Sequence, residues 1–266
     1  MNLLYWLSAL QIILESFPIS SSSHLILFER LMQWCGVAHM PVVLDGSVEA
    51  WQEILNVLHG PTVIVLALFF ARRWLALVTW DKTWFWQIVS WGMLVLVADL
   101  CTLLFFFLFK HTGKDFFPLG LGLCVTAMSL LLTKYYAVDE NKKFDGMAAI
   151  ILGCAQGIAL LPGISRFGFT FMAARWLQFS PRRAFELSFL IELPLIFAAF
   201  VKSAYGLGWL QIQTVFLHVD LILVMIAAMI GAWIGLVVMD YLINTNRMWW
   251  FSVYMILPIT VWCFVR

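Results

Sequence analysis

Two stretches of the sequence decide the fold: QIILESFPISSSSH, residues 11–24, and QGIALLPGISRFGFT, residues 156–170. Both place proline, hydroxyl groups and charges inside segments that are otherwise apolar enough for a membrane interior. In hydrocarbon, every backbone N–H and C=O needs a partner within the protein. A broken, polar backbone therefore survives there only where helices enclose it or where it lines a wet cavity. We expect these two stretches to build the functional site.

The composition around these stretches is that of a membrane protein. Of the 266 residues, 63% are hydrophobic and 12% are charged, and a soluble fold of this composition would expose too much apolar surface. The sequence predicts an all-α integral membrane protein forming a single membrane domain over residues 1–266, with approximate halves 1–136 and 137–266. Most of its apolar runs reach the roughly 20 residues of a spanning helix. The six expected spans are residues 61–71, 85–109, 117–136, 184–201, 217–243 and 248–265.

Charge and cysteine usage exclude several classes of partner. The net charge of +1 argues against nucleic acid, so partners are expected within the bilayer. The five cysteines show no CxxC spacing, which argues against a zinc site. The N-terminus lacks a basic region before its first apolar segment, so we expect that segment to be retained. Two loops, at 72–82 and 134–143, hold more basic residues than the loop between them, which places both in the cytoplasm.

The two stretches also resemble each other. When Gln11 is aligned with Gln156, Ser20 falls on Ser165, and a proline stands shortly before each serine. Duplicated, interrupted segments in the two halves of a membrane chain indicate a central site built from half-helices, often with inverted topology. Two unrelated proline breaks remain an alternative reading of so short a match.

The first stretch has the composition of a phosphate site. Gln11 and Glu15 are four residues apart and share a face if the segment is helical, and Pro18 then ends or kinks that helix. The serines at 20–23 follow, where they can present hydroxyl and backbone N–H groups at the start of the next helix, near His24.

The second stretch supplies a cation to match. Pro162 and Gly163 break the segment, and Ser165, Arg166 and Thr170 follow. A guanidinium group donates two parallel hydrogen bonds that fit phosphate oxygens.

Each of these residues also has a purely structural interpretation. Glu15 could be a carboxylate satisfied by the nearby serines, and the serine run could be a cap and turn. Arg166 could form an ion pair with Glu15, Glu186 or Glu192. A single histidine such as His24 is often a satisfied core residue. An ionisable group within a membrane segment is costly enough to favour function for Glu15.

Together these residues resemble the bacterial undecaprenyl pyrophosphate phosphatase family, also called the bacitracin-resistance family. Its first motif, approximately E-G-x-x-E-F-x-P-[IV]-S-S-[ST]-[GA]-H, resembles residues 11–24. Its second, P-G-x-S-R-S-G-x-T, resembles residues 162–170, with Phe167 in place of the second serine. Weaker resemblance extends through residues 58–74 and 185–194. The resemblance to this family implies a bundle of about six transmembrane helices with re-entrant helix pairs from two inverted repeats.

One departure from the family concerns charge. Gln11 stands where the family has its first glutamate, and an amide carries no charge to hold Mg²⁺ and cannot act as a base. Glu192 stands where the family usually has a small or neutral residue. We interpret it as a replacement carboxylate that, with Glu15, holds a divalent cation, Mg²⁺ or Ca²⁺. A plain ion pair between Glu192 and Arg166 is the alternative.

The resemblance implies hydrolysis of a polyprenyl diphosphate to the monophosphate and phosphate, which recycles the lipid carrier of cell-wall precursors and supports bacitracin resistance. Arg166 would stabilise the transferred phosphoryl group. Ser21 is the implied nucleophile with His24 as its base, and a metal-activated water oriented by Glu15 and His24 is the alternative. The implied substrate-binding residues are Gln11, Ser20, Ser22, Ser165 and Thr170.

The same resemblance places the protein in the bacterial inner membrane as a multi-pass protein with its site toward the periplasm. The sequence is compatible with a homodimer. A different function class also fits the inverted-repeat architecture, namely a polyprenyl-phosphate binding protein or flippase without hydrolytic activity, and an unrelated small-solute transporter is a third alternative.

Overall fold

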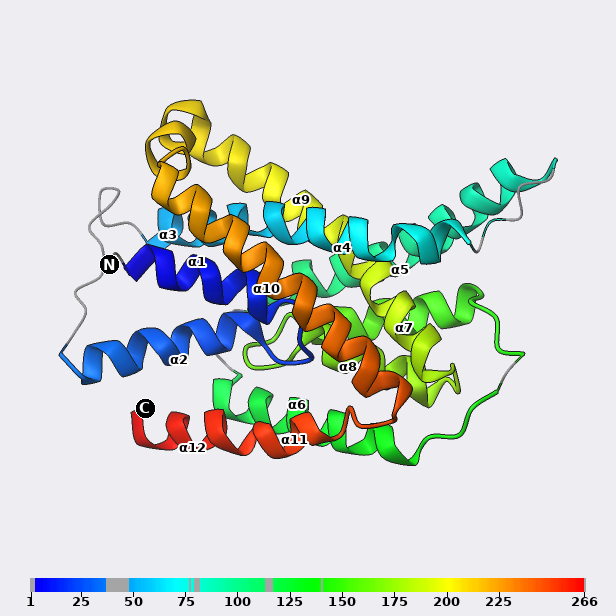
Figure 1. Cartoon of the computed structure of the whole chain (residues 1–266). Helices are drawn as coiled ribbons and strands as arrows, with labels where there is room; N and C mark the ends of the chain where they lie inside the picture. Colours follow the sequence, from blue (N-terminus) through cyan, green and yellow to red (C-terminus); the bar gives the residue numbers. More distant parts are fainter. Residues whose placement is uncertain are drawn as a thin grey trace.

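The computed structural model describes residues 3–36, 48–76, 78, 82–112, 117–139 and 141–265, and within these ranges all regular structure is helical (Figure 1). The elements in chain order are α1 (Leu3–Leu14), α2 (Ser21–Trp34), α3 (Val48–Val57), α4 (His59–Leu75), α5 (Trp84–Thr112), α6 (Leu119–Leu132), the 3₁₀ turn η2 (Thr133–Tyr135), α7 (Gly146–Ile158), α8 (Arg166–Trp176), α9 (Pro181–Phe216), α10 (Val219–Asn244), α11 (Trp250–Tyr254) and α12 (Ile256–Val265).

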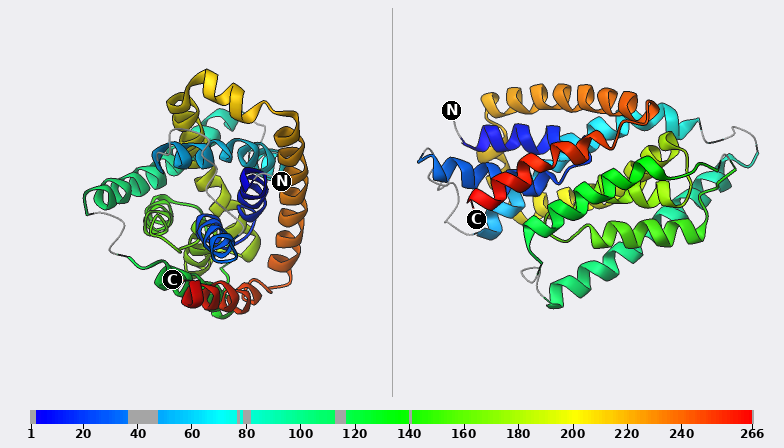
Figure 2. Two further views of the ribbon diagram at one scale, coloured as in Figure 1. Left: turned by 90° about the vertical axis from the view of Figure 1, so that its left-hand side faces the viewer. Right: turned by 90° about the horizontal axis from the view of Figure 1, so that it is seen from below.

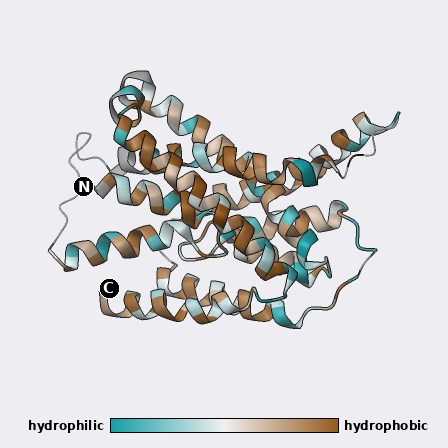
Figure 3. Cartoon of the chain, in the orientation of Figure 1, coloured by the Kyte–Doolittle hydropathy of each residue, from teal (hydrophilic) through white to brown (hydrophobic). Residues whose placement is uncertain are grey.

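The described helices confirm an all-α integral membrane protein. Four are long and apolar enough to cross a bilayer, judged by length and composition: Glu53–Leu75, Trp84–His111, Pro181–Gly208 and Val219–Asn244. The two other predicted spans, 117–136 and 248–265, correspond to shorter apolar helices, Leu119–Tyr135 and Trp250–Phe264. Hydrophobic residues cover most of the helical surface, and hydrophilic ones gather in the connection between α6 and α7 (Figure 3).

The two broken stretches form helical hairpins. α1 ends at Leu14, shortly before Pro18, and α2 begins after Ser20, which has extended backbone angles. In the second hairpin, Gly163 has a φ of 89° in the turn between α7 and α8. This left-handed conformation strains any residue with a Cβ. The hairpins enter the bundle from opposite sides, and their turns meet near its centre (Figure 1).

Each hairpin packs on a long helix of the other half of the chain. α10 lies along α1, as both views of Figure 2 show, and α5 lies along α7. The contacts are close because glycines face the neighbouring helix. Gly231 on α10 faces Ile13, and Gly153 on α7 faces the backbone of Ala98 on α5. This crossed packing ties the halves into one bundle.

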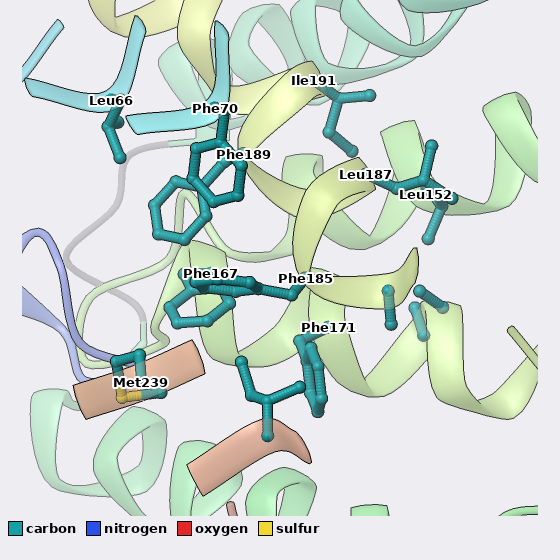
Figure 4. Packing of buried hydrophobic residues seen from close by; sticks show 14 of the residues in the cluster. Leu66, Phe70, Leu152, Phe167, Phe171, Phe185, Leu187, Phe189, Ile191 and Met239 are labelled. Atoms are coloured by element: carbon teal, nitrogen blue, oxygen red, sulfur yellow. The ribbon is translucent and has the colours of Figure 1, made fainter. Parts of the chain in front are cut away.

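An aromatic cluster forms the centre of the core beside these hairpins (Figure 4). The Phe167 and Phe189 rings have centroids 4.5 Å apart, and the Phe70 and Phe189 rings have centroids 5.3 Å apart. Phe185 packs on all three. Because Phe167 is the second residue of α8, its burial fixes the start of that helix. This accounts physically for a phenylalanine where the resembling motif has serine.

Candidate active site

The turn of the first hairpin contacts the start of α8. A Cβ on Gly168 would lie 2.9 Å from the Pro18 carbonyl oxygen and 3.3 Å from the Ser165 side chain. Real Cβ atoms do not approach so closely, so glycine permits this contact. The two stretches that the sequence singled out are therefore adjacent in the fold.

Glu15 lies at the centre of the polar residues at this junction. Its side chain is 3% exposed. Gln11 Nε2 donates to Oε2 over 3.0 Å, and Ser21 Oγ donates to the same oxygen over 3.1 Å. Arg166 Nη2 donates to Oε1 over 2.9 Å, and His59 Nδ1 is 3.6 Å from Oε1. The carboxylate therefore contacts residues from α1, α2, α4 and α8.

Arg166 bridges two carboxylates. Besides its bond to Glu15, its Nε lies 3.3 Å from Glu192 Oε1 on α9. The Arg166 side chain is 22% exposed, whereas those of Glu15 and Glu192 are 3% and 5% exposed. Buried carboxylates paired with a more accessible guanidinium form a site whose cation can still meet an incoming anion. The ion pair with Glu192 that the sequence left open is present.

The serines of the first stretch lie at the start of α2. Ser20 is the N-cap, but its hydroxyl lies 2.7 Å from Ser23 Oγ and accepts no hydrogen bond from the helix backbone. Ser22 is exposed and Ser21 is buried. The first N–H groups of a helix have no intrahelical partner, so this end of α2 can receive an anion.

His24 has a different partner from the one expected. Its Nδ1 lies 2.7 Å from the Ser20 carbonyl oxygen, so Nδ1 carries a proton and donates, and the ring stacks on Tyr254. The Ser21 hydroxyl instead donates to Glu15. The pairing of Ser21 with His24 as its base is therefore not what the structure displays, because Glu15 is the acceptor beside Ser21. His24 Nε2 is buried and has no hydrogen-bond partner.

Ser165 and Thr170 organise the second turn. Ser165 Oγ accepts from the Gly168 N–H, and Thr170 Oγ1 donates to the carbonyl oxygens of Arg166 and Phe167. Thr126 on α6, which the sequence reasoning did not identify, accepts from the Ser165 N–H. These hydroxyl groups hold the start of α8, and with it the backbone of Arg166, in place.

His59 is a further residue of this cluster that the sequence reasoning missed. A signal for it exists in a second internal similarity: EILNVLHGP, residues 53–61, matches ELSFLIELP, residues 186–194, at the glutamate, at the proline and at three apolar positions. The match places His59 on Glu192, two residues before a proline in each case. Aligning these segments would have identified both side chains together.

The polar atoms of this site include oxygen ligands of the type that binds a hard divalent cation. Gln11 Oε1 and Glu192 Oε2 are buried oxygen atoms without a hydrogen-bond partner, and oxygen ligands are the type that Mg²⁺ and Ca²⁺ prefer. The described part of the chain does not contain a group of three or more His, Cys, Asp and Glu side chains arranged to hold a metal ion. A bound cation would therefore use amide oxygen, water or substrate oxygen as well as carboxylates.

These features define a class of protein: a multi-pass helical membrane protein with a buried ionic site where two helical hairpins meet. The sequence profile of the family described as Bacitracin resistance protein BacA matches residues 4–259. Among similar proteins, Undecaprenyl-diphosphatase of Borrelia hermsii is 28% identical, over 96% of this chain and 95% of its own length. Undecaprenyl-diphosphatase of Campylobacter concisus is 31% identical, over 77% of this chain and 80% of its own length. Undecaprenyl-diphosphatase 1 of Shouchella clausii is 27% identical, over 93% of this chain and 90% of its own length.

The family match covers nearly the whole chain, and the relatives align with it over most of their own lengths. The chain belongs to the bacitracin resistance protein BacA family, as a divergent member. This confirms the family that the two motifs indicated.

Proposed function

We propose that this protein hydrolyses undecaprenyl diphosphate to the monophosphate and inorganic phosphate at the site around Glu15. The observation that carries the proposal is the 2.9 Å contact between Arg166 and Glu15, which joins a cation and a carboxylate from opposite halves of the chain. Membership of the family and the names of the similar proteins support the same activity.

The chemistry follows from the residues at the junction. Phosphoryl transfer depends mainly on positioning and on neutralising charge on the transferred group. Arg166 and the N–H groups at the start of α2 would bind the terminal phosphate. Ser21 Oγ, or a water in its place, attacks phosphorus, and the bond from phosphorus to the bridging oxygen breaks, releasing the lipid monophosphate. Glu15 Oε2, 3.1 Å from Ser21 Oγ, accepts the nucleophile's proton. If serine is the nucleophile, water then hydrolyses the phosphoserine.

The remaining predicted residues take supporting roles in this proposal. Ser20, Ser22 and Ser165 line the turns where phosphate would lie, Thr170 holds the Arg166 backbone, and His24 orients the first turn of α2 through its contact with Ser20.

A divalent cation, Mg²⁺ or Ca²⁺, belongs to the proposal. Glu15 and Glu192, with the unpartnered oxygen of Gln11, would hold it. When bound, the cation would neutralise charge on the diphosphate. The site would open toward the periplasmic side of the inner membrane, where it would recycle the carrier lipid of cell-wall synthesis.

Phosphate release from undecaprenyl diphosphate by the purified protein in detergent, with Mg²⁺ or Ca²⁺, tests the proposal. Arg166→Ala should lower the rate about 100-fold or more, because a donor to the developing charge is lost. Arg182→Ala is the matched control. The Arg182 side chain is 63% exposed, and its partner Glu186 also pairs with Arg183, so the rate should be unchanged. Tight lipid binding without phosphate release would instead support a binding protein or flippase.

A further inference from the structure

His59 lies beside Glu15 but has no role in the proposed hydrolysis. It is the first residue of α4, it is 7% exposed, and its Nδ1 has no hydrogen-bond partner. The nearest carboxylate oxygen to Nδ1 is Glu15 Oε1, at 3.6 Å. A buried polar atom without a hydrogen-bond partner destabilises the state in which it lacks one. This arrangement indicates that His59 acquires its partner in another state of the site.

The position of His59 in the first half of the chain has a counterpart in the second half, Glu192. In the second half, the charged residue of the hairpin, Arg166, is paired with Glu192 on the following long helix at 3.3 Å. In the first half, Glu15 faces His59, the first residue of α4. Both partners stand two residues before a proline, at Pro61 and Pro194. Each hairpin thus presents an ionic residue with a partner on a helix that comes later in the same half of the chain.

The competition for Glu15 Oε1 indicates what His59 does. In the structure this oxygen accepts from Arg166 Nη2 over 2.9 Å. A phosphate bound by both prongs of the guanidinium would draw that donor away, and the buried oxygen would then lack a hydrogen bond. Because Oε2 of the same carboxylate accepts from Ser21, any rotation of Glu15 would also misplace the group beside the nucleophile.

We propose that His59 is a positioning residue: when Arg166 binds the phosphate, His59 Nδ1–H donates to Glu15 Oε1 and holds the carboxylate on Ser21. This inference rests on the proposed function. The groups that face this imidazole are Glu15 from the first hairpin and Arg166 from α8, whose Nη2 contacts the same oxygen.

Three substitutions test the proposal through phosphate release. In His59→Asn the amide nitrogen takes the place of Nδ1, whereas in His59→Gln it reaches toward the position of Nε2. His59→Ala and His59→Gln should each lower kcat about tenfold or more, since small misplacements at a reacting centre are costly. KM should change little. His59→Asn should recover kcat to within about threefold of the wild type. His218→Ala, at an exposed histidine before α10, should match the wild type.

Thermal unfolding of each variant accompanies the kinetics. A kcat loss that Asn rescues and Gln does not, at similar stability of these two variants, supports the proposal. Unchanged kcat in His59→Ala, or equal losses in all three variants, would overturn it. Glu15→Gln distinguishes a failure of the proposed hydrolytic site from a failure of the positioning role alone. If Glu15→Gln retains turnover, the proposed site itself is wrong. If it abolishes turnover while the His59 variants behave like the wild type, only the positioning role fails.

Discussion

At the scale of single residues, Glu15 combines deep burial with contacts to four polar side chains. An isolated buried carboxylate would be too costly in a membrane protein. Arg166 compensates its charge, and Gln11 and Ser21 satisfy its other oxygen. The arrangement keeps an anionic acceptor beside a hydroxyl group.

The first prediction concerns this acceptor. Glu15→Gln retains the size of the side chain but removes both the charge and the ability to accept the proton from Ser21. We expect kcat for phosphate release to fall about 100-fold or more, in the range associated with general bases. Turnover above a tenth of the wild-type rate would contradict the role given to Glu15.

The second prediction concerns the proposed replacement of the family's first glutamate, absent at Gln11, by the carboxylate of Glu192. Gln11→Glu would place two carboxylates in contact, where the amide now lies 3.0 Å from Glu15 Oε2. Their repulsion should lower the unfolding temperature in EDTA and increase the stabilisation that Mg²⁺ or Ca²⁺ provides. Glu192→Gln should weaken that stabilisation. If Glu192→Gln leaves both turnover and the response to divalent cations unchanged, the proposed cation site is wrong.

At the scale of elements, helix approach decides where the turns lie. The α7–α8 turn packs on α6, where the Pro162 carbonyl oxygen and Gly163 occupy the space that a Cβ on Gly122 would need. The start of α8 is fixed again by Phe167 in the aromatic cluster. Arg166 thus stands between a turn held by α6 and a ring buried against α9, so its backbone has little freedom.

The third prediction compares two glycines inside helices. Gly122→Ala and Gly92→Ala gain the same helix propensity, but a Cβ at Gly92 meets nothing within 4 Å. Gly92→Ala should be neutral or stabilise the protein by up to about 1 kcal/mol. Gly122→Ala should displace the α7–α8 turn, lowering both the unfolding temperature and kcat. Equal effects of the two substitutions on unfolding and turnover would contradict the role of this close approach.

At the scale of the whole molecule, crossed packing joins the halves, and an ion pair between α4 and α10 reinforces it. Arg73 near the end of α4 donates to both carboxylate oxygens of Asp240 on α10, over 2.8 and 2.9 Å. The side chains are 19% and 26% exposed, so the pair is partly shielded. It links the helix that begins at His59 to the helix that lies along α1.

The fourth prediction follows from that pair. Asp240→Asn leaves the Arg73 guanidinium without its anionic partner and should reduce the free energy of unfolding by about 1–3 kcal/mol. The apolar double variant Arg73→Met with Asp240→Leu should be closer to the wild type, because neither charge is left unpaired. Thermal unfolding in detergent measures both. A double variant less stable than Asp240→Asn would show that the pair contributes more than mutual compensation.

Much of the fold was predictable from local patterns. The lengths of the apolar runs predicted three of the four long helices, because a membrane interior requires continuous apolar helix. The run 61–71 covers only part of the fourth, Glu53–Leu75. Pro18 and the Pro162–Gly163 pair predicted the hairpin turns. The two spans at 117–136 and 248–265 are shorter as helices than their apolar runs suggested, since η2 ends the first and the second begins only at Trp250.

The sequence by itself determined the membrane class, the broken segments, the family and the identity of the charged residues, because composition, helix-breaking residues and motifs are local properties of the chain. The tertiary structure alone decided which groups pair. In the structure, Ser21 donates to Glu15 and not to His24, and His59 lies beside the same carboxylate. Arg166 lies between Glu15 and Glu192. Such pairing depends on how closely helices from opposite halves approach, and that distance is set by packing across the whole bundle.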